Sequence, residues 1–278
     1  MARRWTQSYI ATIAGTLSKT CIAESAGFRL EDVKCGCGRS SWSAPEEAGS
    51  YSIVFVRRGC FRRRAGDVEF LLDPATAYFE RPGEVYRVAH PGDGGDACTQ
   101  LMLPPGLIED GPELELRYTR SDVDLAQRLL VRARADDQVE FVDRAVAIAD
   151  MLLESPASRV AAVRAAAAAT RRRVVEVARE AIAHDPTLDL VELARLAAVS
   201  PHHLSRTFRA ETGETVSRYR NRVRIRLALE RLAEGEDRLA RLAAELGFAD
   251  QAHLSRVVRD EVRRTPTSLR AALRPNRA

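Results

Sequence analysis

The sequence predicts an α+β protein of two domains, with an antiparallel β-barrel and flanking helices followed by an all-α domain. Short apolar runs separated by turn residues fill the segment 50–103, and helical periodicity replaces them beyond Pro112. A sequence repeat occupies the C-terminal third. The chain of 278 residues is long enough for each domain to have its own core.

The strands are expected between Ser50 and Leu103, where β-branched and aromatic runs stop at glycine, proline or aspartate. Turn signals such as Gly66-Asp67 and Asp73-Pro74 separate these runs. Short strands at this spacing are typical of an antiparallel barrel or sandwich. The expected strands are 52–56, 60–64, 68–72, 77–80 and 98–103.

Two amphipathic helices are predicted after the strands, at 122–135 and 139–153, because apolar residues recur three and four positions apart. They could cover the sheet or form a dimer interface. Ser155-Pro156 breaks the pattern, and five consecutive alanines from Ala165 favour a helical connection. We therefore expect a sensing and dimerisation domain over 1–155, a linker over 156–170 and a DNA-binding domain over 171–278.

Composition and charge narrow the class of protein. Residues 171–278 carry 22 Arg and 15 acidic side chains, a net charge of +7, whereas the rest of the chain has a net charge of −3. A cationic C-terminal third favours contact with a polyanion. No apolar run approaches the roughly 18 residues of a membrane span. Without a signal-like apolar segment, and with five cysteines, a reduced cytoplasmic protein is expected.

The repeat consists of two helix–turn–helix units. The string His203-Leu204-Ser205-Arg206 recurs as His253-Leu254-Ser255-Arg256, and Leu193-Ala194 pairs with Leu242-Ala243. Ser200 and Asp250 are expected to cap the second helix of each unit. Between the units, 215–234 has one continuous helical pattern, which corresponds to a rod of roughly 30 Å. Because one turn of DNA is about 34 Å long, both second helices could enter successive major grooves.

These residues resemble the paired helix–turn–helix domain of AraC/XylS-type transcription regulators over roughly 190–270. The resemblance rests on Leu193-Ala194, Ser200, Leu204-Ser205-Arg206, Phe208, Gly213, Tyr219, Arg222, Ala228, Leu242-Ala243, Gly247-Phe248-Ala249-Asp250, His253-Leu254-Ser255-Arg256, Thr265-Pro266 and Arg270. Departures from the family pattern are Ala198 and Arg263, where glycine is usual, Leu254 and Val258, where Phe is usual, and Leu269, where Tyr is usual.

The outer faces of the two second helices supply the candidate DNA contacts. Arg206 and Arg256 occupy equivalent positions in the two units, and together with the resemblance this implies contact with bases. The other candidate base contacts are His202, Ser205, Gln251 and Ala252. Candidate phosphate contacts, which would orient the protein without reading sequence, are Arg209, Arg222 and Arg259.

The N-terminal half resembles the cupin-like sensor and dimerisation domain of the same family in its strand pattern, Gly59 and the Arg81-Pro82-Gly83 turn. That resemblance implies a small organic effector, and apolar strands at 52–56 and 68–72 could line its pocket. A metal-binding cupin needs a His-x-His pair and a further His, but this segment has His90 alone. The sequence therefore argues against a cupin enzyme.

The cysteines leave two interpretations open. Cys35, Cys37, Cys60 and Cys98 lie with His90 in the N-terminal half, and such donors suit a metal or an oxidant-sensing thiol. Arginines beside Cys60 (Arg57, Arg58 and 62–64) would lower its pKa if they faced it. Alternatively, Cys60 and Cys98 are ordinary buried strand residues, and Cys35 and Cys37 lie in a glycine-flanked loop.

The favoured interpretation is a sequence-specific transcription regulator rather than an enzyme. Its expected partners are double-stranded promoter or operator DNA, a second copy of the chain, and RNA polymerase if it activates; no membrane is expected. No cofactor is certain, and the signal is either a small organic effector or a thiol-reactive or metal signal. The alternative is a metal-binding cupin-type enzyme whose C-terminal part only localises it on DNA.

Overall fold

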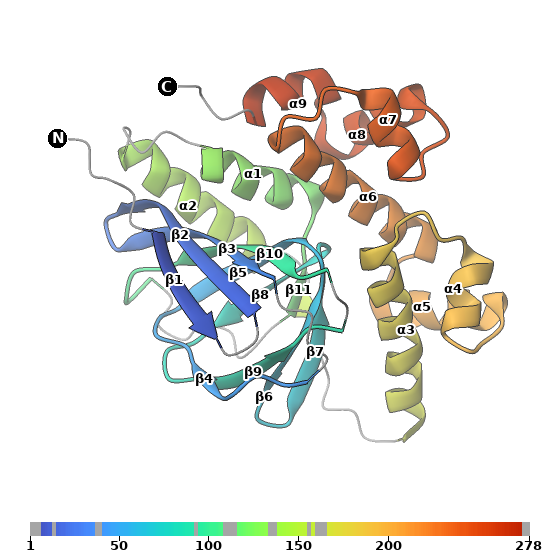
Figure 1. Ribbon diagram of the computed structural model, residues 1–278, viewed down its shortest axis with the longest axis horizontal. Coiled ribbons are helices and arrows are strands. Elements are labelled where there is room, and N and C mark those ends of the chain that lie inside the picture. The colour runs from blue at the N-terminus through green and yellow to red at the C-terminus, as the bar shows by residue number, and fades with distance from the viewer. Residues whose placement is uncertain are drawn as a thin grey trace. The chain divides into compact units, whose positions relative to one another are not determined.

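The computed structural model describes residues 7–12, 15–36, 41–91, 94–107, 116–132, 138–154, 157–158 and 166–273. It divides into two compact units, 1–159 and 160–278 (Figure 1). This division falls inside the expected connection over 156–170. The connection is partly helical, because α3 already begins at Ala166. Cys37 lies outside the described residues.

The first unit contains two antiparallel sheets. The larger has the order β1-β2-β3-β10-β5-β8-β11-β12 and the smaller has the order β4-β9-β6-β7. The bounds of the larger sheet are β1 Gln7–Thr12, β2 Gly15–Ser25, β3 Phe28–Cys35, β10 Asp96–Met102, β5 Ser52–Arg58, β8 Thr76–Glu80, β11 Leu116–Tyr118 and β12 Ala157–Ser158. Those of the smaller are β4 Glu46–Glu47, β9 Val85–Ala89, β6 Phe61–Ala65 and β7 Val68–Leu72.

Strands β5, β6, β7, β8 and β10 confirm the runs predicted between Ser50 and Leu103. Strands β2 and β3 were not predicted because they mix charged and apolar residues without strict alternation. Cys35, expected in a loop, is the last residue of β3.

The predicted closed barrel does not form among the described strands, which remain in two separate sheets. Closure would require an edge of the smaller sheet to hydrogen-bond to the larger one. The edge strand β4 is two residues long and pairs with β9, while the edge strand β7 pairs with β6. Side chains connect the sheets instead: the rings of Phe61 and Tyr78 pack edge to face with their centroids 6.3 Å apart.

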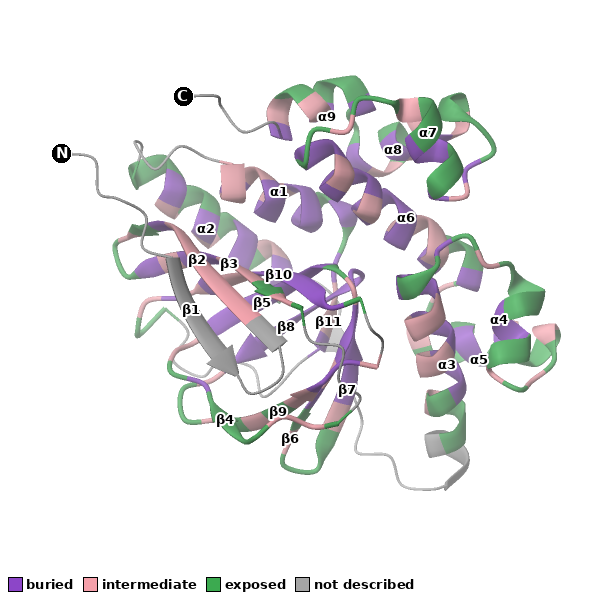
Figure 2. Cartoon of the chain, in the orientation of Figure 1, coloured by how far each residue is buried: buried purple, intermediate pink, exposed green. Residues whose placement is uncertain are grey.

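Helices α1 (Ser121–Arg132) and α2 (Gln138–Leu153) cover the larger sheet, one of the two arrangements that the sequence allowed. Their apolar faces are buried (Figure 2). Helix residues in the core are Val123, Leu130, Phe141, Ala145, Ile148, Ala149 and Leu152, and they pack on strand residues that include Leu30, Ile53, Phe55, Phe79 and Leu101. Burial of each large side chain stabilises this layer by about 1.5–3 kcal/mol.

The second unit is helical. Its elements are α3 Ala166–His184, α4 Leu190–Leu196, α5 Pro201–Thr212, α6 Val216–Ala233, α7 Leu239–Glu245, α8 Gln251–Val262 and α9 Pro266–Leu273. The predicted caps are confirmed. Ser200 accepts a hydrogen bond from the His203 backbone N–H (3.2 Å), and Asp250 accepts one from the His253 backbone N–H (2.7 Å). In the described segments, no helix combines the length and apolarity needed to cross a bilayer.

Left-handed backbone positions recur in both helix–turn–helix units, and they account for the glycine that is usual at the positions of Ala198 and Arg263. In the turn between helices, Ala198 (φ +54°) corresponds to Gly247 (φ +73°). At the end of the second helix, Arg263 (φ +55°) corresponds to Gly213 (φ +77°). Glycine adopts this conformation without strain, whereas a residue with a Cβ pays roughly 1–2 kcal/mol. Ala198 and Arg263 are therefore strained relative to their counterparts.

We predict that Arg263→Gly stabilises the chain. The substitution removes the left-handed strain at the end of α8, and the greater entropy of glycine in the unfolded chain offsets part of the gain, which leaves about 0.5–1 kcal/mol. Urea unfolding followed by helical circular dichroism measures the change. Arg263→Lys keeps the Cβ and serves as the control. A loss of stability in Arg263→Gly would show that the side chain, rather than its backbone conformation, matters at this position.

Candidate nucleic-acid interface

Helix α5 has a buried side and an exposed side. Leu204 and Phe208 are completely buried, four positions apart. On the opposite side His202, Arg206 and Arg209 are exposed, and Ser205 is half-buried. The apolar side fixes the helix against its unit, which leaves a cationic and hydrogen-bonding face toward solvent.

Helix α8 repeats this division of faces. Leu254 and Val258 are completely buried, at positions equivalent to Leu204 and Phe208. The exposed side chains at the predicted contact positions are Gln251, Ala252, Arg256 and Arg259. Both second helices therefore present an arginine at the equivalent exposed position, Arg206 in α5 and Arg256 in α8.

Helix α6 connects the two helix–turn–helix units, with α5 and α8 near its opposite ends (Figure 1). It has 18 residues and so measures about 27 Å. Thr215 caps it by accepting a hydrogen bond from the Arg218 backbone N–H (3.2 Å). The predicted continuous helix over 215–234 is confirmed within one residue at each end.

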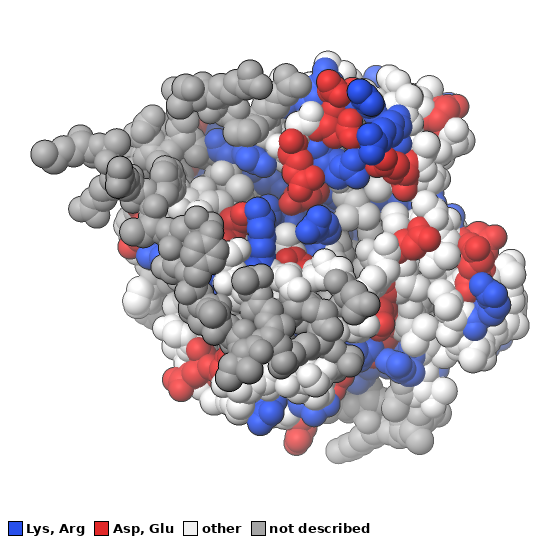
Figure 3. Space-filling view, viewed as in Figure 1, with Lys and Arg blue, Asp and Glu red and all other residues white. Residues whose placement is uncertain are grey.

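Charge is mixed on the face shown in Figure 3, where acidic side chains lie among the basic ones. Exposed arginines in the second unit are often paired, as Arg241 is with Glu245 (2.6 Å). The net positive charge of the C-terminal part therefore supplies only a general attraction for polyanions. Any discrimination between nucleic-acid sequences must come from particular side chains.

Arg222 does not have the exposed position expected of a phosphate contact. Its side chain is 14% exposed, ion-pairs with Glu214 at 3.2 Å, and lies 5.8 Å from the centre of the Tyr219 ring. Tyr219 is completely buried, accepts a hydrogen bond from Arg179 Nε (3.0 Å) and packs edge to face on Phe208. Arg222 thus belongs to the packing of the first helix–turn–helix unit.

Arg224, which was not among the predicted site residues, is a buried arginine that connects the two helix–turn–helix units. Arg224 Nε donates to the Pro186 carbonyl oxygen (2.8 Å) in the α3–α4 loop, and its guanidinium lies 5.7 Å from the Phe248 ring in the α7–α8 turn. Burial, with the neighbouring Arg220 adding to it, lowers the pKa of Arg224 to about 10, so it is still charged at neutral pH. The signal in the sequence was an arginine flanked by the apolar Val223 and Ile225 of α6.

Gly247 allows this close approach. A Cβ at Gly247 would lie 2.7 Å from Arg224 Nη2 and 3.2 Å from the Thr187 Cα. Arg220 supports the same loop because its Nη1 donates to the Leu188 carbonyl oxygen (2.5 Å). The guanidinium groups of Arg220 and Arg224, both on α6, thus hold the α3–α4 loop. That of Arg224 also contacts the turn of the second helix–turn–helix unit.

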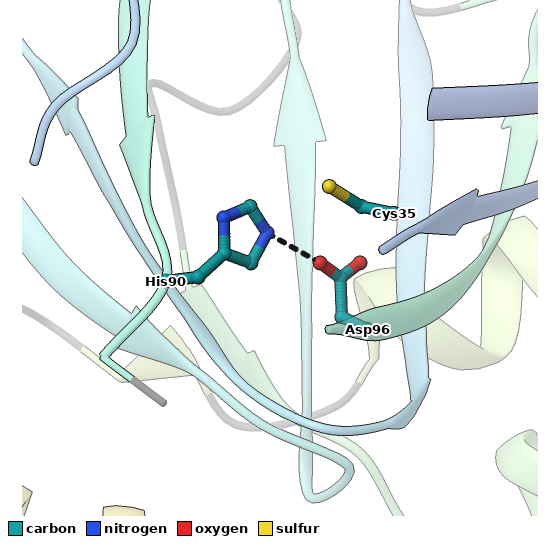
Figure 4. Close-up of side chains that lie close together, drawn as sticks. All are labelled: Cys35, His90 and Asp96. Carbon is teal, nitrogen blue, oxygen red and sulfur yellow. Dashed lines mark hydrogen bonds and ion pairs between the residues drawn. The ribbon is translucent and has the colours of Figure 1, made fainter. Parts of the chain in front are cut away.

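In the first unit of the chain, the structure brings together some of the candidate sensing residues. Cys35, His90 and Asp96 form a group in which each contributes a potential metal ligand atom (Figure 4). Cys98 joins its edge, because its thiol donates to Asp96 Oδ2 (3.3 Å). Asp96 was not predicted. Cys60 is buried and does not belong to the group found among the described residues.

The Cys98 thiol does not have the surroundings of an activated nucleophile. Burial, and next the Asp96 carboxylate, raises the pKa of the Cys98 thiol well above its usual range. Four of the five arginines near Cys60 in sequence have carboxylate partners. Arg57 pairs with Asp32, Arg62 and Arg64 pair with Glu69, and Arg63 pairs with Glu84.

The chain is similar to known regulators in its C-terminal part. The profile of a family described as a helix-turn-helix domain matches residues 193–272. Regulatory protein SoxS of Salmonella typhimurium is 34% identical over 89 residues, which are 32% of this chain and 83% of SoxS. The HTH-type transcriptional regulator Rv1931c of Mycobacterium tuberculosis is 44% identical over 57 residues, which are 20% of this chain and 22% of that regulator.

Among solved structures, ToxT from Vibrio cholerae overlaps 90% of this chain and 99% of its own, with a TM-score of 0.35 and 11% identity.

Gly247→Ala is expected to destabilise the chain more than Gly213→Ala does. Both substitutions put a Cβ at a left-handed residue, but only the Cβ at Gly247 meets another group, because Gly213 has open space around it. The additional loss should be about 1–3 kcal/mol in urea unfolding. The double variant Arg224→Met/Gly247→Ala should lose less than the sum of its parts, since the two sites are in contact. Equal losses for the two glycine variants would contradict the tight junction.

Proposed function

Because the chain belongs to the AraC/XylS family of helix–turn–helix transcription regulators, we propose that it controls transcription by sequence-specific binding to double-stranded promoter or operator DNA. The observation that carries the proposal is the repeated exposed face of α5 and α8. The family consists of regulators, so we do not retain the alternative of a metal-dependent cupin enzyme. If the protein activates transcription, RNA polymerase is its further partner.

In this proposal α5 and α8 enter successive major grooves. The length of α6, about 27 Å, is close to the roughly 34 Å between equivalent points on one DNA turn. Arg206 and Arg256 read bases, because a guanidinium can bond to the O6 and N7 atoms of guanine together. His202, Ser205, Gln251 and Ala252 flank these arginines, and Arg209 and Arg259, further along each helix, contact phosphates. The junction at Arg224 sets the angle between the two reading helices.

We assign sensing to the N-terminal domain, with a cupin-like arrangement of its two sheets. Strand β5 buries its apolar side chains, and β7 buries those of Phe70, Leu71 and Leu72. The guanidinium of the fully buried Arg63 lies 5.0 Å from the centre of the Tyr78 ring and 4.3 Å from that of the Tyr86 ring. Its Nη2 donates to Glu84 (2.6 Å), whereas Nε and Nη1 have no acceptor among the described residues. A small organic effector with a polar group would find two donors there.

Dimerisation is assigned to α2. Val139 (72% exposed) and Leu153 (38% exposed) are large apolar side chains left uncovered at the two ends of α2, and Val146 lies halfway between them at seven-residue spacing. Positions seven apart share one side of a helix, so a second copy of the helix could cover this edge.

Arg206→Ala and Arg256→Ala should each weaken binding to a cognate site by about 1–3 kcal/mol and relax the preference at one base pair. The cognate site is obtained by selection from random duplexes with the full-length protein. Affinities for cognate and scrambled duplexes at one salt concentration measure the effect.

The control for these substitutions is Arg241→Ala, which removes one exposed positive charge from α7, a helix that this proposal does not place in a groove. It should lower both affinities slightly and equally. If Arg206→Ala lowered cognate and scrambled affinity by the same factor, Arg206 would be a phosphate contact instead.

The double substitution Val139→Glu/Leu153→Glu should convert the dimer into monomers, because it places charge on the apolar edge of α2. Analytical ultracentrifugation at tens of micromolar detects an association of roughly 6–7 kcal/mol or stronger. Val191→Glu, at a 63% exposed valine of α4, is the matched control and should remain dimeric. A monomeric wild-type chain at this concentration would refute the homodimer, and a dimeric double variant would refute the assignment to α2.

A further inference from the structure

Three different donor groups meet where the two sheets of the N-terminal domain come together. The Cys35 sulfur, a nitrogen of the His90 ring and a carboxylate oxygen of Asp96 all lie within 4.8 Å of one another. Figure 4 shows the three side chains directed toward a common point. We propose that Cys35, His90 and Asp96 bind a zinc-type divalent cation, and, resting on the proposed function, that this cation is a signal the regulator senses.

The sheet register places these residues together. Asp96, the first residue of β10, pairs directly with Cys35, the last residue of β3. Residues directly opposite in an antiparallel pair project to the same face, about 4.5–5.5 Å apart. His90 follows β9 of the smaller sheet. A bound cation would therefore link the larger sheet to the smaller one, which share no backbone pairing among the described strands.

The donor set matches the chemistry of zinc. Thiolate sulfur, imidazole nitrogen and carboxylate oxygen are the three protein ligands that this ion takes, and a mixed set of them suits magnesium and calcium poorly. A thiolate and a carboxylate together neutralise the two positive charges of the ion. Three protein ligands also leave a fourth tetrahedral position open for water.

The spacing requires only a small adjustment. His90 Nε2 and Asp96 Oδ1 are 2.5 Å apart and share a hydrogen bond. Ligands around tetrahedral zinc, at about 2.0–2.3 Å from the ion, lie roughly 3.3–3.8 Å from one another. The cation would replace the shared proton, and the distance between these two atoms would increase by about 1 Å.

Neighbouring groups orient the ligands. Cys98 Sγ donates to the second carboxylate oxygen of Asp96 at 3.3 Å, which fixes the plane of that carboxylate. The His90 ring packs on Phe61, with centroids 6.0 Å apart. The nearby cation, Arg57, ion-pairs with Asp32, so its charge is balanced. His90 and Asp96 are buried and Cys35 is half-buried, which leaves the thiol side of the group open to an entering ion.

Cobalt(II), added to the full-length protein after removal of metals by a chelator, tests the site directly. We expect one ion per chain, with the charge-transfer absorption of a thiolate–cobalt bond and the intense visible bands of four-coordination. Zinc(II) should displace cobalt, and magnesium should not. Cys35→Ser should abolish the charge-transfer band, and His90→Gln and Asp96→Asn should each weaken binding at least about tenfold.

Cys21→Ser is the matched control, because Cys21 is a half-buried thiol of β2 outside the group. It should leave the cobalt spectrum unchanged. Circular dichroism of each variant verifies its fold, and Cys35→Ser, a near-isosteric change at a half-buried position, decides the result if a variant of the buried residues does not fold. A wild-type chain without stoichiometric cobalt binding, or a charge-transfer band that survives in Cys35→Ser, would overturn the site.

A second measurement separates the site from its role as a signal. The affinity of the metal-free protein for its selected duplex should change at least about fivefold when zinc(II) is added, and the Cys35→Ser variant should not respond. Stoichiometric metal binding with unchanged DNA affinity would refute the signalling role and leave the site standing. Failure to enrich any DNA sequence, with or without metal, would refute the proposed regulator function, and the cobalt spectra would still decide the site.

Discussion

The geometry of the C-terminal unit depends on one buried guanidinium. Arg224 extends from α6 to a backbone carbonyl of the α3–α4 loop, which precedes the first helix–turn–helix unit, and to an aromatic ring of the second unit. A buried charge is costly unless it is hydrogen-bonded, so this arrangement specifies one orientation more strictly than apolar packing would. Two recognition helices can read one DNA segment only if their separation and angle are fixed. The junction at Arg224 thus connects the internal packing of the unit with its proposed function.

The two helix–turn–helix units adopt the same backbone conformation at positions where their sequences differ. In the turns, alanine stands in the first helix–turn–helix unit where glycine stands in the second. At the ends of the second helices the order is reversed, with glycine in the first unit and arginine in the second. Each unit therefore carries one strained residue. At Gly247 glycine is required by the contact with Arg224, whereas Gly213 has open space around it. Glycine is therefore needed in the turn of the second helix–turn–helix unit for two reasons, the left-handed backbone of Gly247 and the close approach of its neighbours.

The N-terminal domain places polar groups between its sheets. Arg63 with its tyrosines and glutamates forms one such cluster, and Cys35, His90 and Asp96 form another. Burial of charged and metal-ligating side chains costs stability that an apolar interior would not cost. Both clusters use side chains from the two sheets, and the sheets lack direct backbone pairing in the described strands. A ligand bound at either cluster would change how the sheets are held together.

Sequence patterns were sufficient to predict the elements that depend on neighbours a few residues away. The capping bonds of Ser200 and Asp250 reach three residues along the chain, and the periodicity of α1, α2, α5 and α8 already marked their buried sides. The repeat likewise gave the equivalence of Arg206 and Arg256. Arg222 marks the limit of such patterns, since nothing in them indicated its ion pair with Glu214. That Asp96 lies opposite Cys35, and that Arg224 reaches Pro186, 38 residues away, became visible in the folded chain. Such contacts depend on strand register and on helix packing over long separations, which local sequence patterns do not encode.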